Sequence, residues 1–326
     1  MSHPYAELSP DLILDAIDAQ GFVTDGRLLA LNSYENRVFQ VGLEDSGFVV
    51  AKFYRPARWS DEAILEEHAF SLALAAEEIP VVAPLANDAG HTLHHHDGFR
   101  FAVFPRQGGR YPNLDDPDHL EWLGRFLGRI HQLGASRAFA HRPNTDPATL
   151  GREPADWLLQ SPLLPVEYRD RYQAVTNALI NRCEAVFASV KPRQIRLHGD
   201  CHPGNVLWTD EGPHFVDMDD CRMGPAAQDL WMLLSGDRDD MAWQMDALLE
   251  GYDTFSSFDP KELALIEPLR ALRLIHYGSW LARRWDDPAF PQAFPWFGTP
   301  HYWEEQLATF EQQLQVLDMP PLQRFG

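Results

Sequence analysis

The residues best suited to chemistry in this chain of 326 residues are Asp200, Asn205 and Asp217. Short apolar runs flank them, so we expect all three on loops between strands. A carboxylate can orient an acceptor hydroxyl and take its proton. An amide oxygen and a second carboxylate suit Mg²⁺, which prefers oxygen ligands. These are the groups that a magnesium-dependent phosphoryl transferase needs, because such enzymes mainly position the acceptor and neutralise charge.

The spacing supports this interpretation. His198-Gly-Asp200 with Asn205 matches the H-x-D-x-x-x-x-N pattern of a kinase catalytic loop. Asp217 follows an apolar run and stands where the magnesium aspartate of D-F-G stands, although the next residues are Met-Asp-Asp without a glycine. A polar hairpin with incidental acids is the alternative, and this combination of spacings argues against it.

A lysine must be placed against the phosphates, and Lys52 is the candidate. It stands inside the apolar run Phe48-Val-Val-Ala-Lys-Phe-Tyr54, which predicts a strand. A helix should begin after Ser60 and carry Glu66 and Glu67. A strand lysine paired with a helix glutamate is the kinase arrangement, and we favour Glu67 over Glu66 as the partner. An edge-strand lysine facing water is the alternative.

A loop covering the phosphates is also needed. Asn32-Ser-Tyr-Glu-Asn36 separates two predicted strands and contains no glycine. The hydroxyl of Ser33 and backbone N–H groups could still contact phosphates there. An ordinary polar turn is the competing interpretation.

The N-terminal third reads as a small sheet with helices. A helix should begin at Ser9-Pro10, and strands are expected over 28–31, 37–41 and 48–54. The histidines between His91 and His96 could suggest a metal site. Asp97-Gly98 favours a hairpin instead, since no acidic or thiol partner stands at ligand spacing. A Pro/Gly segment after Phe104 indicates a boundary, so we expect an N-lobe over 1–105 and a C-lobe over 106–326.

The remainder reads as mainly helical. Helices are expected near 120–133, after Pro165, and over 226–234, 237–252, 260–285 and 301–317. His131 reads as a packed histidine rather than a base. Asp229 is an outlier among apolar neighbours. The segment 283–297 is too aromatic for a solvated loop, so we expect it to pack across helix ends, with a substrate wall as the alternative.

Composition limits the partners. The formal net charge is −21, which disfavours nucleic acid and anionic membranes but not a nucleotide neutralised locally by lysine and Mg²⁺. Three cysteines suggest neither a disulfide framework nor a zinc site. A redox role for Cys201 and Cys221 is less favoured than simple packing. No signal peptide or membrane span is visible, so we expect a cytoplasmic monomer.

These motifs together resemble the aminoglycoside phosphotransferase and choline kinase superfamily. H-G-D in place of H-R-D, and the lack of an A-P-E motif, point away from eukaryotic protein kinases. The resemblance implies an α+β, two-lobed protein-kinase-like fold with a small β-rich N-lobe and a larger, mainly helical C-lobe.

Longer blocks resemble the bacterial stress response kinases of that superfamily. They include 32–39, 52–56, 64–68, 101–105, 196–202, 228–234 and 283–291. The resemblance implies a cytoplasmic, ATP- and Mg²⁺-dependent serine/threonine protein kinase. By position it makes Asp200 the proton acceptor and makes Asn205 and Asp217 magnesium ligands, with Asp217 also an active-site residue. Ser33 and Lys52 would contact the ATP phosphates, and Asp229 would brace the catalytic loop.

Two other functions stay open at this point. One is a kinase for a small amine, amino alcohol or sugar, which an acidic C-lobe would suit. The other is a catalytically silent binding module, although the joint presence of Lys52, Asp200, Asn205 and Asp217 argues against it.

Overall fold

The computed structural model describes residues 4–324, so the start of the N-terminal stretch searched for a signal peptide lies outside the described residues. The chain divides into two compact units. The first consists of Met1–Pro112, Phe139–Arg142 and Gly204–Asp220, and the second of Asn113–Ala138, Pro143–Pro203 and Cys221–Gly326. Two segments from later in the chain therefore belong with the N-terminal unit.

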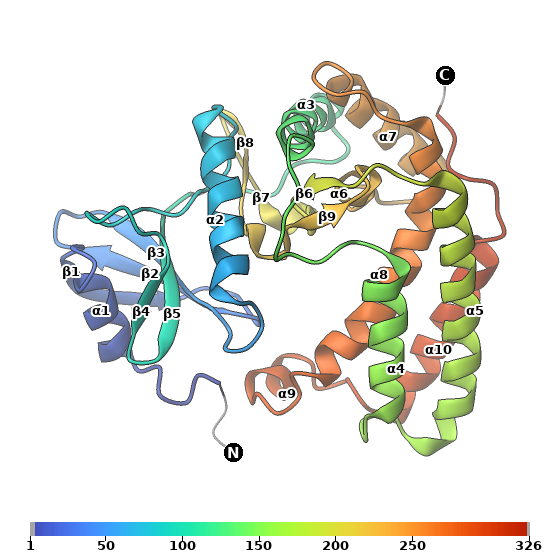
Figure 1. The fold of residues 1–326 in the computed structure, drawn as a ribbon, viewed down its shortest axis with the longest axis horizontal. Coiled ribbons are helices and arrows are strands. Elements are labelled where there is room, and N and C mark those ends of the chain that lie inside the picture. The colour runs from blue at the N-terminus through green and yellow to red at the C-terminus, as the bar shows by residue number, and fades with distance from the viewer. Residues whose placement is uncertain (1–3, 325–326) are drawn as a thin grey trace. The chain divides into compact units, whose positions relative to one another are not determined.

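A five-stranded antiparallel sheet forms the centre of the first unit (Figure 1). The strand order is β1-β2-β3-β5-β4, so β3 is the central strand. The three strands predicted first are confirmed, with β1 beginning earlier than expected. The bounds are β1 Thr24–Ala30, β2 Arg37–Leu43, β3 Phe48–Phe53, β4 His94–His96 and β5 Phe99–Pro105.

Two helices complete the N-terminal part of this unit. Helix α1 (Pro10–Asp18) begins as predicted, with the Ser9 hydroxyl accepting from the amide of Leu12, and it packs its apolar face against Phe53 and Phe101 of the sheet. Helix α2 (Asp61–Ala76) begins after Ser60, whose hydroxyl accepts from the amide of Ala63. Serine caps satisfy amides that a helix start leaves without partners.

The predicted hairpin between β4 and β5 is confirmed. Asp97 and Gly98 both have positive φ, 44° and 82°, the geometry of a tight two-residue hairpin turn. His95 forms a 3.1 Å contact with Asp61. Among residues 4–324 no group of three or more His, Cys, Asp or Glu side chains could hold a metal ion.

The segment 204–220 is attached to the first unit through main-chain pairing. It contains most of η2 (Pro203–Asn205), whose first residue belongs to the second unit. It also contains the hairpin of β7 (Val206–Thr209) and β8 (Gly212–Phe215), and the 3₁₀ turn η3 (Met218–Asp220). Trp208 exchanges two main-chain hydrogen bonds with Arg110, and Phe215 donates to Pro80. This pairing fixes the segment that carries Asp217 against residues 80–110.

The second unit is mainly helical, as predicted. It contains the short strand pair β6 (Ile195–Leu197) and β9 (Arg222–Gly224), and the helical elements α3 (Pro117–Gly134), η1 (Ala148–Arg152), α4 (Glu153–Gln160), α5 (Val166–Val190), α6 (Ala227–Trp231), α7 (Arg238–Tyr252), η4 (Pro260–Leu265), α8 (Ile266–Ala282), α9 (Ala289–Ala293) and α10 (Pro300–Val316).

Two helix predictions in this unit need correction. The helix expected over 226–234 is regular only in α6, because the chain turns after Trp231. The helix expected over 260–285 begins as the 3₁₀ segment η4, which Asp259 caps, and continues as α8. The apolar pattern identified both segments but could not resolve the hydrogen-bond register within them.

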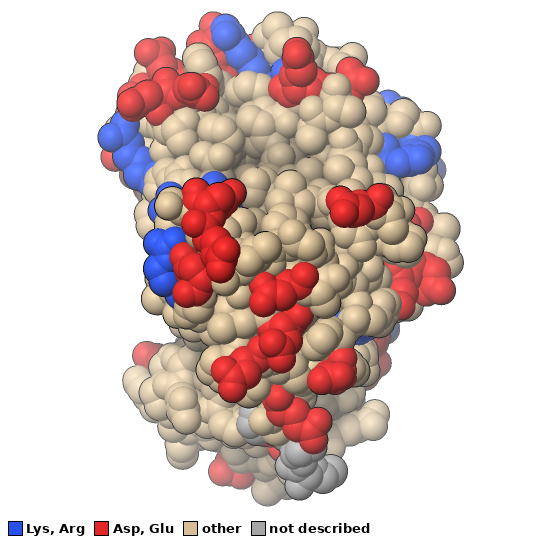
Figure 2. All heavy atoms as spheres, turned by 90° about the vertical axis from the view of Figure 1, so that its left-hand side faces the viewer, with Lys and Arg blue, Asp and Glu red and all other residues tan. Residues whose placement is uncertain are grey.

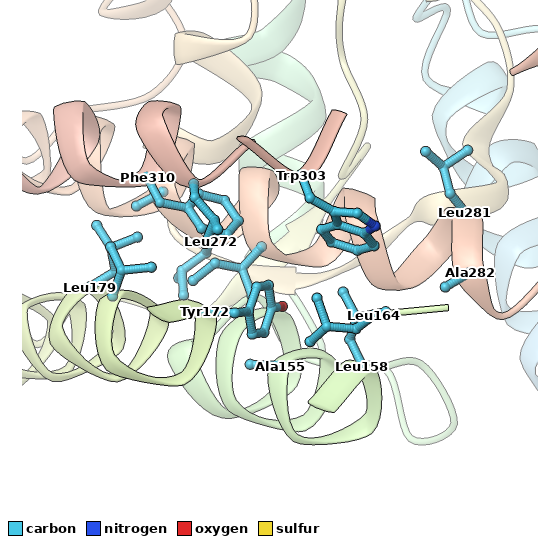
Figure 3. Close-up of a cluster of buried hydrophobic side chains, with 14 of the residues drawn as sticks. Ala155, Leu158, Leu164, Tyr172, Leu179, Leu272, Leu281, Ala282, Trp303 and Phe310 are labelled. Carbon is cyan, nitrogen blue, oxygen red and sulfur yellow. The ribbon is translucent and has the colours of Figure 1, made fainter. Parts of the chain in front are cut away.

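The main core of this unit lies among α4, α5, α8 and α10 (Figure 3). Tyr172 of α5 faces Trp303 and Phe310 of α10, and Leu272 contributes from α8. The aromatic segment 283–297 contains α9 and packs Phe290 and Phe297 onto this core. The packing role predicted for it is confirmed. None of the described helices is both long and apolar enough to cross a membrane.

Helices α3 and α7 approach each other closely through glycines. A Cβ atom on Gly124 of α3 would collide with the carbonyl oxygen of Leu248, and one on Gly251 of α7 would collide with that of Glu121. Backbone atoms cannot move aside as a flexible side chain can, so this helix pair requires small residues.

We predict that Gly124→Ala lowers the free energy of unfolding by about 1–3 kcal/mol, the usual cost of overpacking a tight contact. Denaturant titration followed by circular dichroism measures it. Gly108→Ala is the control, since its Cβ would meet only the tip of Arg106 at 4.0 Å. Equal stability of the two variants would contradict the backbone contact.

Candidate active site

Lys52 is the centre of an ion cluster in the first unit. It lies on the central strand β3 and is 5% exposed. Its Nζ lies 3.3 Å from Glu67 Oε1, 3.0 Å from Asp217 Oδ1 and 3.7 Å from Asp219 Oδ1. The edge-strand alternative is therefore wrong for this lysine, because β3 has neighbours on both sides and the charge is buried.

Electrostatics stabilise the ionised form of Lys52 in this cluster. Burial alone would lower the pKa of Lys52, but the carboxylates of Asp217, Glu67 and Asp219 raise it well above its usual value. Burial raises the pKa of Glu67, an effect that Lys52 partly offsets. The cluster therefore keeps a positive charge next to carboxylates.

Glu67 is the lysine partner, as we expected. It lies on the buried face of α2, and Arg142 also approaches it, with 3.6 Å between Nη2 and Oε2. Glu66 has a different role: its two carboxylate oxygens accept from the amides of Ala140 and His141, at 2.7 and 2.8 Å. The helical face decides which of two adjacent glutamates meets the strand.

Asp219 is a member of the cluster that the sequence analysis did not single out. It is buried, bonds to Arg58 and accepts from Asn36 Nδ2 at 3.1 Å. Burial raises the pKa of Asp219, but Arg58 and then Lys52 lower it below the ordinary value. The sequence feature that could have pointed to Asp219 is the acidic stretch from Asp217 to Asp220.

Ser33 lies in a loop attached to the same cluster. Its hydroxyl donates to the carbonyl oxygen of Asn36 at 3.1 Å. The Asn36 side chain is buried, donates to Asp219 and accepts from the amide of Arg55 at 3.1 Å. The side-chain hydrogen bonds of Asn36 thus hold this glycine-free loop in place.

Asp217 and Asn205 are joined through the main chain. The amide of Val216 donates to the carbonyl oxygen of Asn205 at 3.0 Å. Asp217 has a φ of 58°, in the left-handed region that aspartate tolerates better than most residues, and its side chain is 54% exposed. An exposed carboxylate and a nearby amide residue form an oxygen donor set that fits Mg²⁺.

Asp229 organises the corresponding part of the second unit. It is fully buried, and its two carboxylate oxygens accept from the amides of His198 and Gly199, each at 2.8 Å. His131 Nε2 lies 3.0 Å from Asp229, and His131 Nδ1 lies 3.0 Å from the Tyr252 hydroxyl. These contacts lower the pKa of Asp229 despite its burial. The predicted packed role of His131 is confirmed.

Asp200 follows directly after the two residues that Asp229 holds. Gly199 supplies the required turn with a φ of 87°. Arg273 Nη1 donates to Asp200 Oδ1 at 2.7 Å, and His202 Nε2 lies 3.5 Å from Oδ2. The sequence analysis missed Arg273, because it lies 73 residues away on a helix with no local signal.

The helix that carries Asp229 is itself held by side chains. Gln228 Nε2 donates to the carbonyl oxygen of Gly199 at 3.1 Å. Glu262, which is buried, accepts from the amide of Ala227 at 3.0 Å at the start of α6. Burial raises the pKa of Glu262 to about 7.

The cysteines near the loop are packed. Cys201 and Cys221 are fully buried and form no disulfide. Burial, with Asp229 and Asp200 nearby, raises the pKa of the Cys201 thiol well above its usual value, so the thiolate that redox chemistry requires is disfavoured.

Comparison with known proteins identifies the family of this chain. The model of the phosphotransferase enzyme family (APH) matches residues 27–266, which include Lys52, Asp200, Asn205 and Asp217. The chain belongs to this family. Its members are phosphotransferases, so this chain is a phosphotransferase.

Similar curated proteins are named as stress response kinases. Stress response kinase A of Escherichia coli (strain K12) is 49% identical over 321 residues, which cover 98% of this chain and 96% of that protein. The serine/threonine protein kinase RdoA of Salmonella typhimurium is 47% identical over 319 residues, with the same coverage. This phosphotransferase therefore also belongs to the stress response kinase A family.

Solved structures share the fold. An amicoumacin kinase in complex with AMP-PNP and Ca²⁺ has a TM-score of 0.72 at 19% identity, covering 97% of this chain and 95% of that one. A microcompartment-associated aminopropanol kinase has a TM-score of 0.71 at 18% identity, covering 94% and 99%. The predicted α+β fold of the aminoglycoside phosphotransferase and choline kinase type is confirmed.

We predict that Glu262→Gln removes a pH dependence of stability from the phosphotransferase. The folded-state pKa of about 7 lies above the ordinary glutamate pKa of 4.5. The stabilising contribution of Glu262 is therefore fully present below pH 4.5 and is lost as pH rises through 7. The loss should be about 3 kcal/mol. Denaturant titrations of both proteins between pH 4.5 and 8 measure it. Parallel stability curves would contradict the raised pKa.

Proposed function

We propose that this phosphotransferase is an ATP- and Mg²⁺-dependent kinase that phosphorylates serine and threonine hydroxyls of proteins. The observation that carries the proposal is the ion cluster around Lys52, in a chain 47% identical to a serine/threonine protein kinase. The proposed location is the cytoplasm, where both ATP and Mg²⁺ are available.

Lys52 would hold the α- and β-phosphates of ATP. Its ionised state is supported by three carboxylates, and Glu67 fixes the direction of its side chain. The loop that carries Ser33 would cover the phosphates with its hydroxyl and backbone N–H groups. Asn36 keeps this loop attached to Asp219.

Asn205 and Asp217 would hold Mg²⁺. Their oxygen donors suit this ion, and Asp217 is exposed enough to reach it. When bound, the ion neutralises charge on the phosphates. Asp217 then serves both as a metal ligand and as an active-site residue, because it also contacts Lys52.

Asp200 would accept the proton of the acceptor hydroxyl. The hydroxyl oxygen attacks the γ-phosphorus, the bond from that phosphorus to the bridging oxygen breaks, and ADP leaves with that oxygen. The hydroxyl proton moves to the Asp200 carboxylate. Asp229 holds the backbone before Asp200 through two amides, so it is a positioning residue.

Surface charge is compatible with several acceptors. On the face drawn in Figure 2, Asp and Glu side chains gather in groups, while Lys and Arg lie mainly near its borders. Such a surface disfavours nucleic acid. It would also suit a cationic metabolite, so a small-molecule kinase is the alternative that experiment must separate.

We predict that Asp200→Ala lowers phosphoryl transfer by about 10²–10⁴-fold, the usual contribution of a general base, while nucleotide affinity changes little. Steady-state kinetics and ATP titration measure the two effects. Asp210→Ala, on the exposed turn between β7 and β8, is the matched control. Wild-type activity in Asp200→Ala would refute the assigned role.

The class of acceptor can be identified from the molecules to which the enzyme transfers a labelled phosphoryl group. Incubation with γ-labelled ATP, cell extract protein and a metabolite mixture should label serine and threonine residues of proteins. Label found on small metabolites and never on protein would replace the proposal with the small-molecule kinase. No transfer to either acceptor would favour the silent binding module.

We predict different effects for the two neighbouring glutamates. Glu67→Gln should lower kcat/KM for ATP about tenfold or more, because Lys52 loses a charged partner and each 1.4 kcal/mol corresponds to a factor of ten. Glu66→Gln keeps one side-chain oxygen that can accept from the amides of Ala140 and His141, so its kcat/KM for ATP should stay near the wild-type value. Equal losses in both variants would show that the Lys52 contact is not what matters.

A further inference from the structure

Arg273 is the residue whose position is not yet explained by the proposed function. It lies on α8, in the same unit as Asp200, and its Nη1 donates to Asp200 Oδ1 at 2.7 Å. The Arg273 side chain is 46% exposed and that of Asp200 22% exposed. A cation therefore lies directly on the carboxylate that would face the acceptor hydroxyl.

The neighbouring arginine on the same helix has a different environment. Arg270 contacts Glu267 at 3.3 Å and stacks over the ring of Trp231, 5.1 Å from its centroid. It also donates to the sulfur of Met241. Arg270 thus serves packing within the unit, whereas the charged contact of Arg273 is with Asp200.

We propose that Arg273 is a positioning and specificity-determining residue, which holds Asp200 and favours acceptor hydroxyls flanked by acidic side chains of a polypeptide. This inference rests on the proposed protein kinase activity. It names the class of acceptor, a serine or threonine beside Asp or Glu, and it disfavours acceptors that carry an amine next to the hydroxyl.

The positioning part follows from the geometry of a carboxylate. Arg273 binds Oδ1 and His202 lies 3.5 Å from Oδ2, so both contacts restrict rotation of the Asp200 carboxylate. A carboxylate has lone pairs for more than one donor, so the arginine need not leave when the hydroxyl arrives.

The specificity part follows from charge. Guanidinium has five N–H donors in a planar fork and can bind a second carboxylate while it keeps the first. The chain has a net charge of −21, so the positive charge of Arg273 is opposite in sign to the net charge of the protein. An acidic flank gains an ion pair there, and an ammonium group is repelled.

The test uses synthetic peptides with one serine flanked by Asp, by Ala or by Lys, phosphorylated by the full-length enzyme. We expect wild type to prefer acidic over basic peptides about two- to fivefold in kcat/KM, the range of an exposed ion pair. Arg273→Glu should reverse the order. Arg273→Lys should keep the order with a lower kcat, because the charge remains and the fork is lost.

Arg152→Glu is the matched control. Arg152 is similarly exposed and also pairs with one carboxylate, that of Glu184 at 2.9 Å. This variant has the same charge change as Arg273→Glu and should keep the wild-type preference.

Two outcomes would overturn the inference in distinguishable ways. If wild type phosphorylates the peptides and Arg273→Glu leaves the order unchanged, the role of Arg273 is wrong and the protein kinase activity stands. If wild type phosphorylates amino alcohols and no peptide, the proposed function fails, and the acceptor class named for Arg273 fails with it.

Discussion

The first unit depends on one constraint, the burial of a charged lysine in the central strand of a sheet. An unpaired buried ammonium would cost several kcal/mol. Carboxylates from α2 and from the 217–219 segment meet Lys52 and satisfy it. The helix and the later segment are therefore held against β3, and the same contacts bring together the groups that we propose bind the nucleotide phosphates and their metal.

The second unit also contains a buried charge that must be satisfied, and here the charge is negative. Asp229 is a buried carboxylate, and two amides and an imidazole satisfy it. Removing these donors would leave a charge in an apolar interior, so His198 and Gly199 have little freedom. The chain passes from the second unit to the first between Pro203 and Gly204.

Local signals predicted much of the fold. Ser9 and Ser60 cap helices, and Asp97-Gly98 turns a hairpin, because each acts through neighbours within a few residues. The pairing of Lys52 with Glu67 was also accessible, since strand and helix periodicities determine which faces meet.

Contacts over long sequence distances could not be predicted in this way. Arg273 reaches Asp200, and Arg58 reaches Asp219 across 161 residues. Neither arginine differs locally from an ordinary surface arginine. The strand β9 has three residues and gains its register from distant segments, β6 and the stretch Pro143–Thr145. The chain leaves α6 early without a local stop signal.

The central claim is that the Lys52 cluster with Asp217 binds the phosphates of ATP through Mg²⁺. Calorimetric titration of ATP and of adenosine, with and without Mg²⁺, tests it in wild type and in Asp217→Asn, whose half-exposed position tolerates the change. We expect Mg²⁺ to strengthen binding of ATP to wild type, this gain to be largely lost in the variant, and adenosine to bind both alike. An equal gain from Mg²⁺ in both proteins would contradict the account.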